Sequence, residues 1–224
     1  MTTDSGRLIY LNGSYVKELD AKISIFDSAL MFGDMVFEMT RSFKKKQFKL
    51  EEHIERLLYG VKIYEIPLKK TAKEIKEICL QTIELNEPAF SDTDEHRLMI
   101  NVSRGPLGVY APIFDYNLEP TLVVADFPLK WTVSYMGQLY DEGINAVLVS
   151  QRAMPSYLMD PKIKNRSRVF YQMANIEASK FKGKNNWALL MGLDGHIAEG
   201  SGDNFFIIKN GVVITPEPRD ILVG

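Results

Sequence analysis

Apolar and polar residues alternate with a period of two over several short stretches in the first half of the chain. Such alternation is typical of strands that bury one face. The pair Asn12-Gly13 separates two of these stretches, and Asn-Gly between apolar runs is a strong signal for a hairpin. The expected strands lie at residues 8–16, as that hairpin, and at residues 23–25, the second half of 26–43, 47–50, 97–105 and 121–127.

Two segments of the same half follow the period of an amphipathic helix instead. Apolar residues recur every three or four positions over residues 51–64, and Arg56 lies off the apolar face that they form. Thr71 and Glu74 have the spacing of a capping box, so a second helix is expected to begin there and to end at residues 86–88. Arg56 is therefore available to contact something other than the core.

The second half combines the same patterns around one glycine-rich turn. Expected strands cover residues 143–149 and 187–191, an amphipathic helix covers residues 170–181, and a hairpin closes around Asn210-Gly211. The mixed aromatic and polar segment at residues 128–137 follows a strand and is the best candidate for a domain boundary. We therefore expect an N-terminal domain at residues 1–128, a linker at 129–137 and a C-terminal domain at 138–224.

Length and composition are those of an ordinary globular protein, with 224 residues, 46% hydrophobic residues and a formal net charge of −2. This charge gives no electrostatic reason to expect a nucleic-acid surface. The apolar runs are strand-sized, which argues against a membrane span, and the N-terminus lacks the pattern of a signal peptide. Cys79 is the sole cysteine, and its spacing in the second helix favours a core position. A cytoplasmic protein that binds small molecules is the expectation.

Few motifs in the chain carry chemistry. The three histidines have no metal-ligand spacing, so no metal site is expected, and no nucleophile elbow, Walker loop or dinucleotide fingerprint occurs. What remains is Lys164, just before the helix at residues 170–181, and Glu199, at a strand end on the glycine-rich turn. A lysine can act as a covalent catalyst by forming a Schiff base, and a carboxylate near a pyridine nitrogen makes a pyridoxal ring an electron sink. Spacing alone also permits a solvated lysine and a strand-ending glutamate.

Several motifs together resemble the class-IV aminotransferases, the pyridoxal-phosphate enzymes of fold type IV. They occur in the family's order and spacing over nearly the whole chain. The matching stretches are Leu11-Asn-Gly13, Phe32-Gly-Asp-Met-Val-Phe-Glu38, His53-Ile-Glu-Arg-Leu57, Lys164, Glu177-Ala178, Glu199-Gly-Ser-Gly-Asp-Asn-Phe205, Asn210-Gly211 and Thr215-Pro216. The resemblance implies an α+β fold of two domains, a small N-terminal α/β domain and a larger, β-barrel-like C-terminal domain.

The resemblance assigns a role to three residues by position. Lys164 would form the Schiff base with pyridoxal 5'-phosphate and move the proton between the substrate and the cofactor. Arg56 would bind the cofactor's phosphate, which suits the planar fork of a guanidinium. Glu199 would face the pyridine nitrogen. The implied reaction is ping-pong transamination, in which an amino acid gives its amine to the cofactor and a 2-oxo acid collects it.

Within the family, the N-terminal half is most similar to the branched-chain amino-acid aminotransferases. Arg97 falls where that group has an arginine that helps to bind the α-carboxylate, and Phe37 falls near an apolar wall of the pocket. Trp131 and Tyr135 fall near the pocket's aromatic residues. Such a pocket would suit an aliphatic side chain, while core packing is an equally good explanation for each aromatic residue.

Two departures from the branched-chain pattern leave other activities open. Ser167-Arg-Val169 stands where the branched-chain enzymes have Asn-Tyr, and Arg168 there resembles the aminodeoxychorismate lyases. Arg168 could bind the cofactor's phenolate oxygen, bind a substrate carboxylate or cap the helix. The carboxylate-binding arginine of D-amino-acid transaminases is missing after Arg104-Gly105. The alternatives are thus a D-amino-acid or (R)-amine transaminase, an aminodeoxychorismate-lyase-like enzyme and an inactive relative.

The resemblance also bears on the C-terminus and on assembly. In the family, the stretch that corresponds to residues 220–224 leads into a Gly-Ile-Thr-Arg segment that binds the phosphate at a helix N-terminus. The C-terminal domain is therefore expected to be incomplete at its end, in an incomplete chain or a shortened relative. The family further implies a homodimer, in which the loop at residues 106–117 contributes to the partner's active site.

Overall fold

The computed structural model describes residues 5–223, which form two compact units. The first unit extends to Val133 and also includes Lys164–Ser167, and the second contains Ser134–Ile163 and the residues from Arg168 onward. The chain therefore leaves the first unit, returns to it for four residues and leaves it again. Nothing in the periodicity of the sequence indicates this return.

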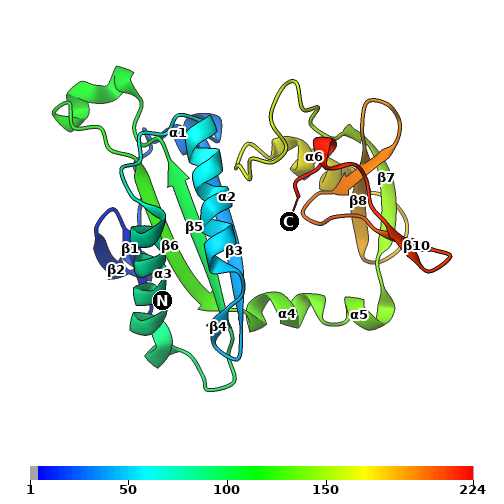
Figure 1. Cartoon of the computed structure of the whole chain (residues 1–224), viewed down its shortest axis with the longest axis horizontal. Coiled ribbons are helices and arrows are strands. Elements are labelled where there is room, and N and C mark those ends of the chain that lie inside the picture. The colour runs from blue at the N-terminus through cyan, green and yellow to red at the C-terminus, as the bar shows by residue number, and fades with distance from the viewer. Residues whose placement is uncertain (1–4, 224) are drawn as a thin grey trace. The chain divides into compact units, whose positions relative to one another are not determined.

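The first unit is built on a six-stranded antiparallel sheet with the spatial order β2-β1-β6-β5-β3-β4 (Figure 1). Its strands are β1 (Leu8–Leu11), β2 (Ser14–Lys17), β3 (Met35–Phe43), β4 (Lys46–Gln47), β5 (His96–Ser103) and β6 (Thr121–Pro128). The hairpin predicted around Asn12-Gly13 is confirmed, because Leu11 pairs with Ser14 across that turn. β4 is shorter than expected because a helix already begins at Leu50.

The strand predicted at residues 23–25 was wrong, and a buried aspartate explains why. The N–H of Asp27 donates to the carbonyl of Ser24 at 3.1 Å, which closes a turn. Its carboxylate accepts the N–H of Ala29 at 2.8 Å and so caps the short helix α1 (Ser28–Phe32). These local bonds use backbone groups that a strand would pair with its neighbour.

Two helices cover one face of the sheet, α2 (Leu50–Ile63) and α3 (Ala72–Asn86), as Figure 1 shows. Both were predicted, and the capping box of Thr71 and Glu74 is present at the start of α3. Cys79 of α3 is fully buried, as its spacing indicated. Because side chains alternate along a strand, β3 directs Glu38 toward these helices and Phe37 toward the opposite face.

A buried ionic network joins β5, β6 and the end of α3. His96 is fully buried, with Nδ1 2.8 Å from Asp126 Oδ2 and Nε2 2.7 Å from Glu87 Oε2. Glu87 opens a short 3-10 helix, η2 (Glu87–Ala89). Burial alone would lower the pKa of His96, but the hydrogen bonds and charges of Asp126 and Glu87 outweigh burial and raise it above its ordinary value. The folded chain therefore favours an imidazolium that joins two carboxylates.

The free energy of unfolding is expected to fall as the pH rises through the pKa of His96 in the folded chain. A pKa raised by folding means that the folded chain binds the proton more tightly. The stabilisation is therefore complete below the pKa of an unfolded histidine, about 6.5, and is lost above the folded pKa. Urea unfolding at a series of pH values on both sides of neutrality measures the decline. His96→Gln is expected to remove it, and an unchanged profile in that variant would assign it to another group.

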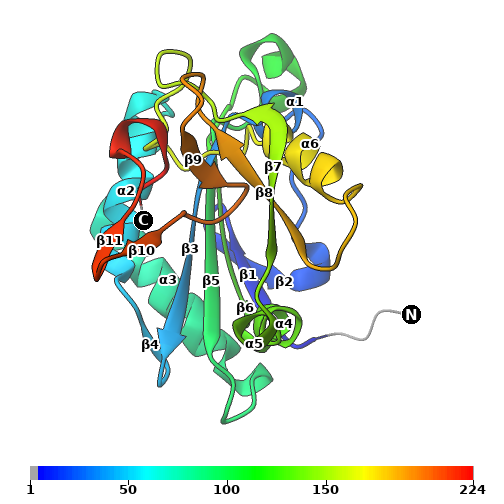
Figure 2. The same cartoon turned by 90° about the vertical axis from the view of Figure 1, so that its right-hand side faces the viewer.

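The second unit contains a three-stranded sheet and a separate hairpin (Figure 2). β7 (Asn145–Arg152), β8 (Asn186–Met191) and β9 (Ile197–Gly200) lie in that order, with β7 and β8 parallel and β8 and β9 antiparallel. Helix α6 (Val169–Ala178) packs Ala174 and Ala178 against the buried residues of this sheet. The hairpin predicted at Asn210-Gly211 is present as β10 (Ile207–Lys209) and β11 (Val212–Ile214). In the described residues these strands form an open sheet and a hairpin rather than a closed barrel.

Short helices fill most of the remaining connections. They are α4 (Lys130–Met136), α5 (Leu139–Glu142) and the 3-10 helices η1 (Glu18–Asp20), η3 (Gly108–Phe114) and η4 (Pro218–Asp220). α4 begins inside the segment expected to be a linker, and η3 lies inside the loop expected at residues 106–117. Between residues 5 and 223, no helix combines the length and the apolar character needed to cross a membrane.

Candidate functional site

Lys164 lies in a short extended segment that pairs with the first half of β3. The N–H of Phe37 donates to the carbonyl of Lys164, and the N–H of Arg166 donates to the carbonyl of Met35, both at 2.9 Å. Val36 and Asn165 therefore face each other in an antiparallel bridge. Residues opposite each other in such a pair project from the same face. The side chains of Lys164 and Arg166 thus lie on the face of β3 that carries Phe37.

This second face of the sheet, opposite to α2 and α3, is the candidate substrate-binding surface of the first unit. It is formed by alternate residues of β3 and β5, namely Met35, Phe37, Met39, Arg41, Arg97, Met99 and Asn101. Phe37 is buried, and the amine of Lys164 lies 5.2 Å from the centroid of its ring. The amine of Lys164 therefore lies near an aromatic ring, unlike that of a solvated lysine.

A close contact between Gly33 and Ser167 fixes the downstream end of the Lys164 segment. Gly33 ends α1 with a φ of 67°, and a Cβ at this position would lie 2.8 Å from Ser167 Oγ and 3.0 Å from Ser167 Cα. The Ser167 hydroxyl donates to the carbonyls of Phe32 and Gly33 at 3.1 and 3.2 Å. The corner after α1 therefore requires glycine both for its conformation and for the approach of this segment.

Arg56 projects from α2 toward β3, where Glu38 receives it. Nη2 of Arg56 donates to Glu38 Oε2 at 2.8 Å, and Nε donates to Oε1. His53 Nδ1 also lies 2.8 Å from Oε2. Glu38 is fully buried, and burial alone would raise its pKa, but the hydrogen bonds from Arg56 and His53 outweigh burial and lower it. This ionised carboxylate holds the guanidinium of Arg56 in one orientation.

In the second unit, Glu199 ends β9 as a buried carboxylate with a partner on each oxygen. Tyr171 of α6 donates its hydroxyl to Oε1, and the N–H of Leu222 donates to Oε2 at 3.0 Å. Burial raises the pKa of Glu199, and the two hydrogen bonds offset part of that rise. The pKa of Tyr171 is raised by burial and then by the charge of Glu199. The two donors therefore support the ionised form of a carboxylate that burial would otherwise keep protonated.

Arg168 lies beside this pair, at the N-cap position of α6. Its side chain makes no capping hydrogen bond; Nη2 instead donates to the carbonyl of Ser201 at 2.8 Å. Its guanidinium lies 4.4 Å from the centroid of the Tyr171 ring. Of the three roles considered for Arg168, helix capping by the side chain is thus not what the structure shows. The cation is directed to the turn that follows Glu199.

The remaining candidate residues are distributed over both units. Arg97 of β5 lies on the second face, opposite Arg41, and donates to Thr132 Oγ1 at 2.5 Å. Burial, together with the charge of Arg41, lowers the pKa of Arg97. Trp131 stacks on Phe127 with ring centroids 6.0 Å apart, which agrees with a packing role. Tyr135 belongs to the second unit and is 72% exposed, so its role in binding stays a prediction.

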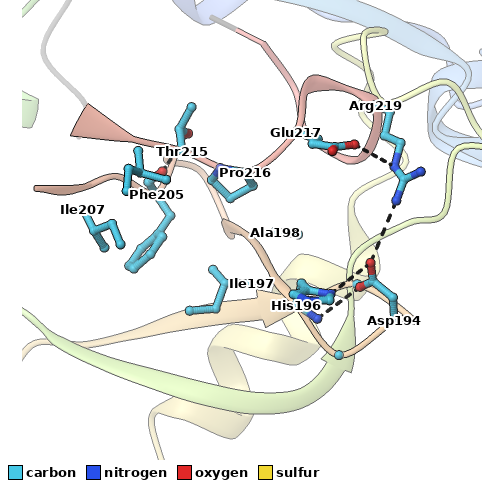
Figure 3. A pocket seen from close by; sticks show the side chains of 13 residues that line it. Asp194, His196, Ile197, Ala198, Phe205, Ile207, Thr215, Pro216, Glu217 and Arg219 are labelled. Carbon is cyan, nitrogen blue, oxygen red and sulfur yellow. Dashed lines mark hydrogen bonds and ion pairs between the residues drawn. The ribbon is translucent and has the colours of Figure 1, made fainter. Parts of the chain in front are cut away.

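The cavity in Figure 3, of about 660 Å³, lies between the β8–β9 turn and the β10–β11 hairpin. Its ionic residues include Asp194, which lies 3.2 Å from His196 Nδ1 and 4.0 Å from Arg219 Nη2. None of the predicted site residues lines it, so the candidate chemistry lies elsewhere. Within the described part of the chain, no cluster of three or more His, Cys, Asp or Glu side chains could hold a metal ion.

Three residues with evident roles in this geometry were not singled out from the sequence: Glu38, Arg166 and Tyr171. Glu38 carries one detectable signal, since it is a carboxylate at a position of β3 that alternation predicts to be buried. Tyr171 has no such signal, because an aromatic residue in an amphipathic helix is ordinarily core. Arg166 could not be recognised because its position follows from the pairing of its segment with β3, which the sequence does not predict.

Replacing Tyr171 with phenylalanine is expected to raise the pKa of Glu199 further and to destabilise the fold at neutral pH. A hydrogen bond to a charged group contributes about 1.5–3 kcal/mol. Urea unfolding of the variant and the wild type measures the difference, which should shrink in acid, where Glu199 is protonated in both. Tyr157→Phe changes a tyrosine that is 76% exposed and serves as the matched control. Equal losses in the two variants would contradict a role for the Tyr171 hydroxyl.

Comparison with known proteins points to one family. The model of the family described as "Amino-transferase class IV" matches residues 35–224. A "Putative branched-chain-amino-acid aminotransferase" of Methanocaldococcus jannaschii is 34% identical over 208 residues, which cover 93% of this chain and 67% of that protein. The structure of the branched-chain aminotransferase of Thermoproteus uzoniensis with norvaline is 27% identical and has a TM-score of 0.80, over 97% of this chain and 71% of that one.

A second solved structure is similar over nearly the whole chain. The T.th. branched-chain amino acid aminotransferase, complexed with N-(5'-phosphopyridoxyl)-L-glutamate, is 26% identical with a TM-score of 0.80, over 98% of this chain and 70% of that one. These similarities extend over both units and confirm the predicted α+β fold. The matched residues include β3, the segment of Lys164 and the turn that carries Glu199. The chain therefore belongs to the class IV aminotransferase family.

Proposed function

We propose that this chain catalyses the transamination of branched-chain amino acids with a 2-oxo acid as acceptor, with pyridoxal 5'-phosphate as cofactor and Lys164 as the residue that joins it. The proposal rests above all on the position of Lys164. Its backbone is paired with β3, and its amine lies 5.2 Å from the ring centroid of Phe37. A rigid backbone and a packed side chain are what a covalent catalyst requires.

Each unit contains residues that suit this cofactor. When bound, pyridoxal phosphate supplies an aldehyde that an amine can attack and a ring that accepts electrons. Arg56, oriented by Glu38, offers a guanidinium to the phosphate. Glu199 offers the ring nitrogen a carboxylate whose ionised form is supported by Tyr171 and by the N–H of Leu222. Lys164 removes a proton from the Cα of the amino acid and holds it for return.

The second face of the sheet suits an aliphatic substrate. The floor of this surface has an apolar patch of Phe37, Met39 and Met99, bordered by the guanidinium groups of Arg97 and Arg166. An aliphatic side chain placed on such a floor gains free energy from the apolar area that it covers, about 25 cal/mol per Å². The relative from Thermoproteus uzoniensis, whose structure contains norvaline, supports this assignment.

We further propose that the chain works in the cytoplasm as a homodimer. The resemblance to the family supports the dimer, and a chain with one cysteine suits a reducing compartment. Sedimentation of the purified protein tests the dimer, and the mass of a single chain at working concentrations would contradict it. The loop at residues 106–117 is the segment proposed to reach the partner's site.

Two measurements test the proposed function. The first is the absorption spectrum of the purified protein with pyridoxal phosphate, and the second is borohydride reduction followed by mapping of the labelled peptide. A visible band and a pyridoxyl group on Lys164 are expected. Labelling scattered over surface lysines would mean that Lys164 is not the site. Valine, leucine and isoleucine are then supplied with 2-oxoglutarate, in parallel with D-alanine, an (R)-amine and aminodeoxychorismate. Turnover of one of the latter three, in place of the branched-chain amino acids, would replace the proposed substrate.

A further inference from the structure

Arg166 stands two residues after Lys164 in the segment that pairs with β3. Alternate residues of an extended segment project to the same side, so both side chains lie over the second face of the sheet. Both contact the same aromatic ring: the guanidinium of Arg166 lies 3.6 Å from the centroid of Phe37 and the amine of Lys164 lies 5.2 Å from it. A molecule within reach of the Lys164 amine is therefore also next to Arg166.

Asn101 fixes the orientation of this guanidinium. Its Oδ1 accepts a hydrogen bond from Nη2 of Arg166 at 2.9 Å and a longer one from Nε at 3.3 Å. Asn101 lies in the middle of β5 and is buried, although asparagine is disfavoured in strands. A ring below and an amide at its edge thus hold the cation before any ligand arrives. Binding then costs little side-chain entropy.

The carboxylate of an amino acid is attached to the carbon that also carries the reacting amine. A cation that binds this carboxylate must therefore lie within a few ångströms of the catalytic lysine. Arg97, the arginine expected to help bind the α-carboxylate, lies four residues from Asn101 along β5, which is roughly 13 Å between the Cα atoms. Arg166 satisfies the requirement and Arg97 is placed much farther along the face.

We propose that Arg166, held by Asn101 and Phe37, binds the carboxylate attached to the reacting carbon of the substrate. This inference rests on the proposed function, since it takes Lys164 as the catalytic lysine. A guanidinium offers a carboxylate two parallel N–H groups, which also sets the orientation of the Cα relative to the amine of Lys164. Arg166 is thus a specificity-determining residue, and substrates that lack a carboxylate forfeit this contact.

The test measures how the cofactor-loaded protein binds 4-methylvalerate, which is leucine without its amino group, and the neutral 4-methylvaleramide. Arg166→Met keeps the length and apolar contacts of the side chain and removes its charge. We expect its dissociation constant for 4-methylvalerate to rise about 10- to 100-fold, the size of a lost hydrogen-bonded charge contact. The dissociation constant for the amide is expected to change less than about threefold, since the amide carries no charge.

Two further variants complete the test. Arg166→Lys keeps the charge but not the fork, so an intermediate loss is expected, and it remains informative if Arg166→Met fails to fold. Arg152→Met changes an exposed arginine of β7 that donates to the carbonyls of Val149 and Ser150, outside the second face, and should leave the binding of 4-methylvalerate unchanged. Unchanged binding in both Arg166 variants, or the same loss instead in Arg97→Met, would overturn the inference.

The cofactor band and the binding of 4-methylvalerate distinguish a failure of the proposed function from a failure of the role assigned to Arg166. If the wild-type protein shows no cofactor band on Lys164, the proposed function fails and the inference fails with it. If the band is present in the wild type and in Arg166→Met but 4-methylvalerate binds both equally, only the inference fails. Support for the inference also requires that KM for leucine rises in Arg166→Met more than kcat falls, because the contact is made in the bound substrate.

Discussion

Lys164→Ala is expected to abolish covalent attachment of pyridoxal phosphate and to lower the rate of transamination by about 10²- to 10⁴-fold through the lost proton transfer alone. Alanine has no amine that could join the aldehyde or accept a proton from the Cα of the substrate. The fold should survive, because the segment is held by backbone hydrogen bonds to Met35 and Phe37. The measurements are kcat with leucine and 2-oxoglutarate, and the yield of labelled peptide after borohydride reduction.

Lys162 offers a matched control for this variant. It is exposed and lies two residues upstream, outside the segment that pairs with β3. Lys162→Ala should therefore retain both the activity and the label on Lys164. A Lys164→Ala protein that still turned over leucine at a rate near that of the wild type would remove Lys164 from the chemistry. Urea unfolding of the two variants separates a loss of chemistry from a loss of fold.

Glu38→Ala is expected to cost about 3–5 kcal/mol of unfolding free energy, because it removes one partner of a buried ion pair and leaves the other without compensation. Glu38 is fully buried and receives both Arg56 and His53. The same change should weaken binding of pyridoxal phosphate, since Arg56 would lose the carboxylate that orients it. Urea unfolding and a cofactor titration followed by absorption measure the two effects.

An exposed ion pair on the same helix supplies the control. Glu52 pairs with Lys49 at 2.9 Å, with both side chains 57% exposed, so Glu52→Ala should leave the free energy of unfolding nearly unchanged. The pH adds a second check, because folding lowers the pKa of Glu38. The stabilisation that it provides is then present above the unfolded pKa and lost as the pH falls through the folded pKa. A variant as stable as Glu52→Ala at neutral pH would contradict the buried-pair argument.

The elements that could be predicted from sequence are those with a complete local signal. Asn12-Gly13 and Asn210-Gly211 set turns whose geometry needs no help from distant residues, and both hairpins are present. Thr71 and Glu74 form a capping box that is likewise local. The expected strand at residues 23–25 failed because Asp27 closes a turn onto Ser24, and the carboxylate of Asp27 is held by Ser103 and Thr121, which lie far away in sequence. The alternation of polar and apolar residues along a segment cannot predict a contact with residues so distant in sequence.

The residues of the candidate site also differ in whether a local sequence signal identifies them. Lys164, Arg56 and Glu199 stand in motifs and could be named from the resemblance, whereas Tyr171 and Asn101 could not. Tyr171 meets Glu199 across 28 positions of sequence, and Asn101 meets Arg166 across 65. Tyr171 and Asn101 each act on one distant residue, and contacts between distant positions leave no periodic pattern in the sequence. The contact between Asn101 and Arg166 also depends on the pairing of the Lys164 segment with β3, which is itself a tertiary contact.

The return of Lys164–Ser167 to the first unit has a consequence for recombination between relatives. A chimera joined once, near Val133, would take Lys164 from the donor of the C-terminal part while β3 came from the other parent. The donor's residue 167 would then have to fit against residue 33 of the other parent. The two residues lie so close that a Cβ at position 33 would be 3.0 Å from the Cα of Ser167. Chimeras that fold should therefore take residues 164–167 from the same parent as the N-terminal part. Such a chimera needs three crossovers in place of one.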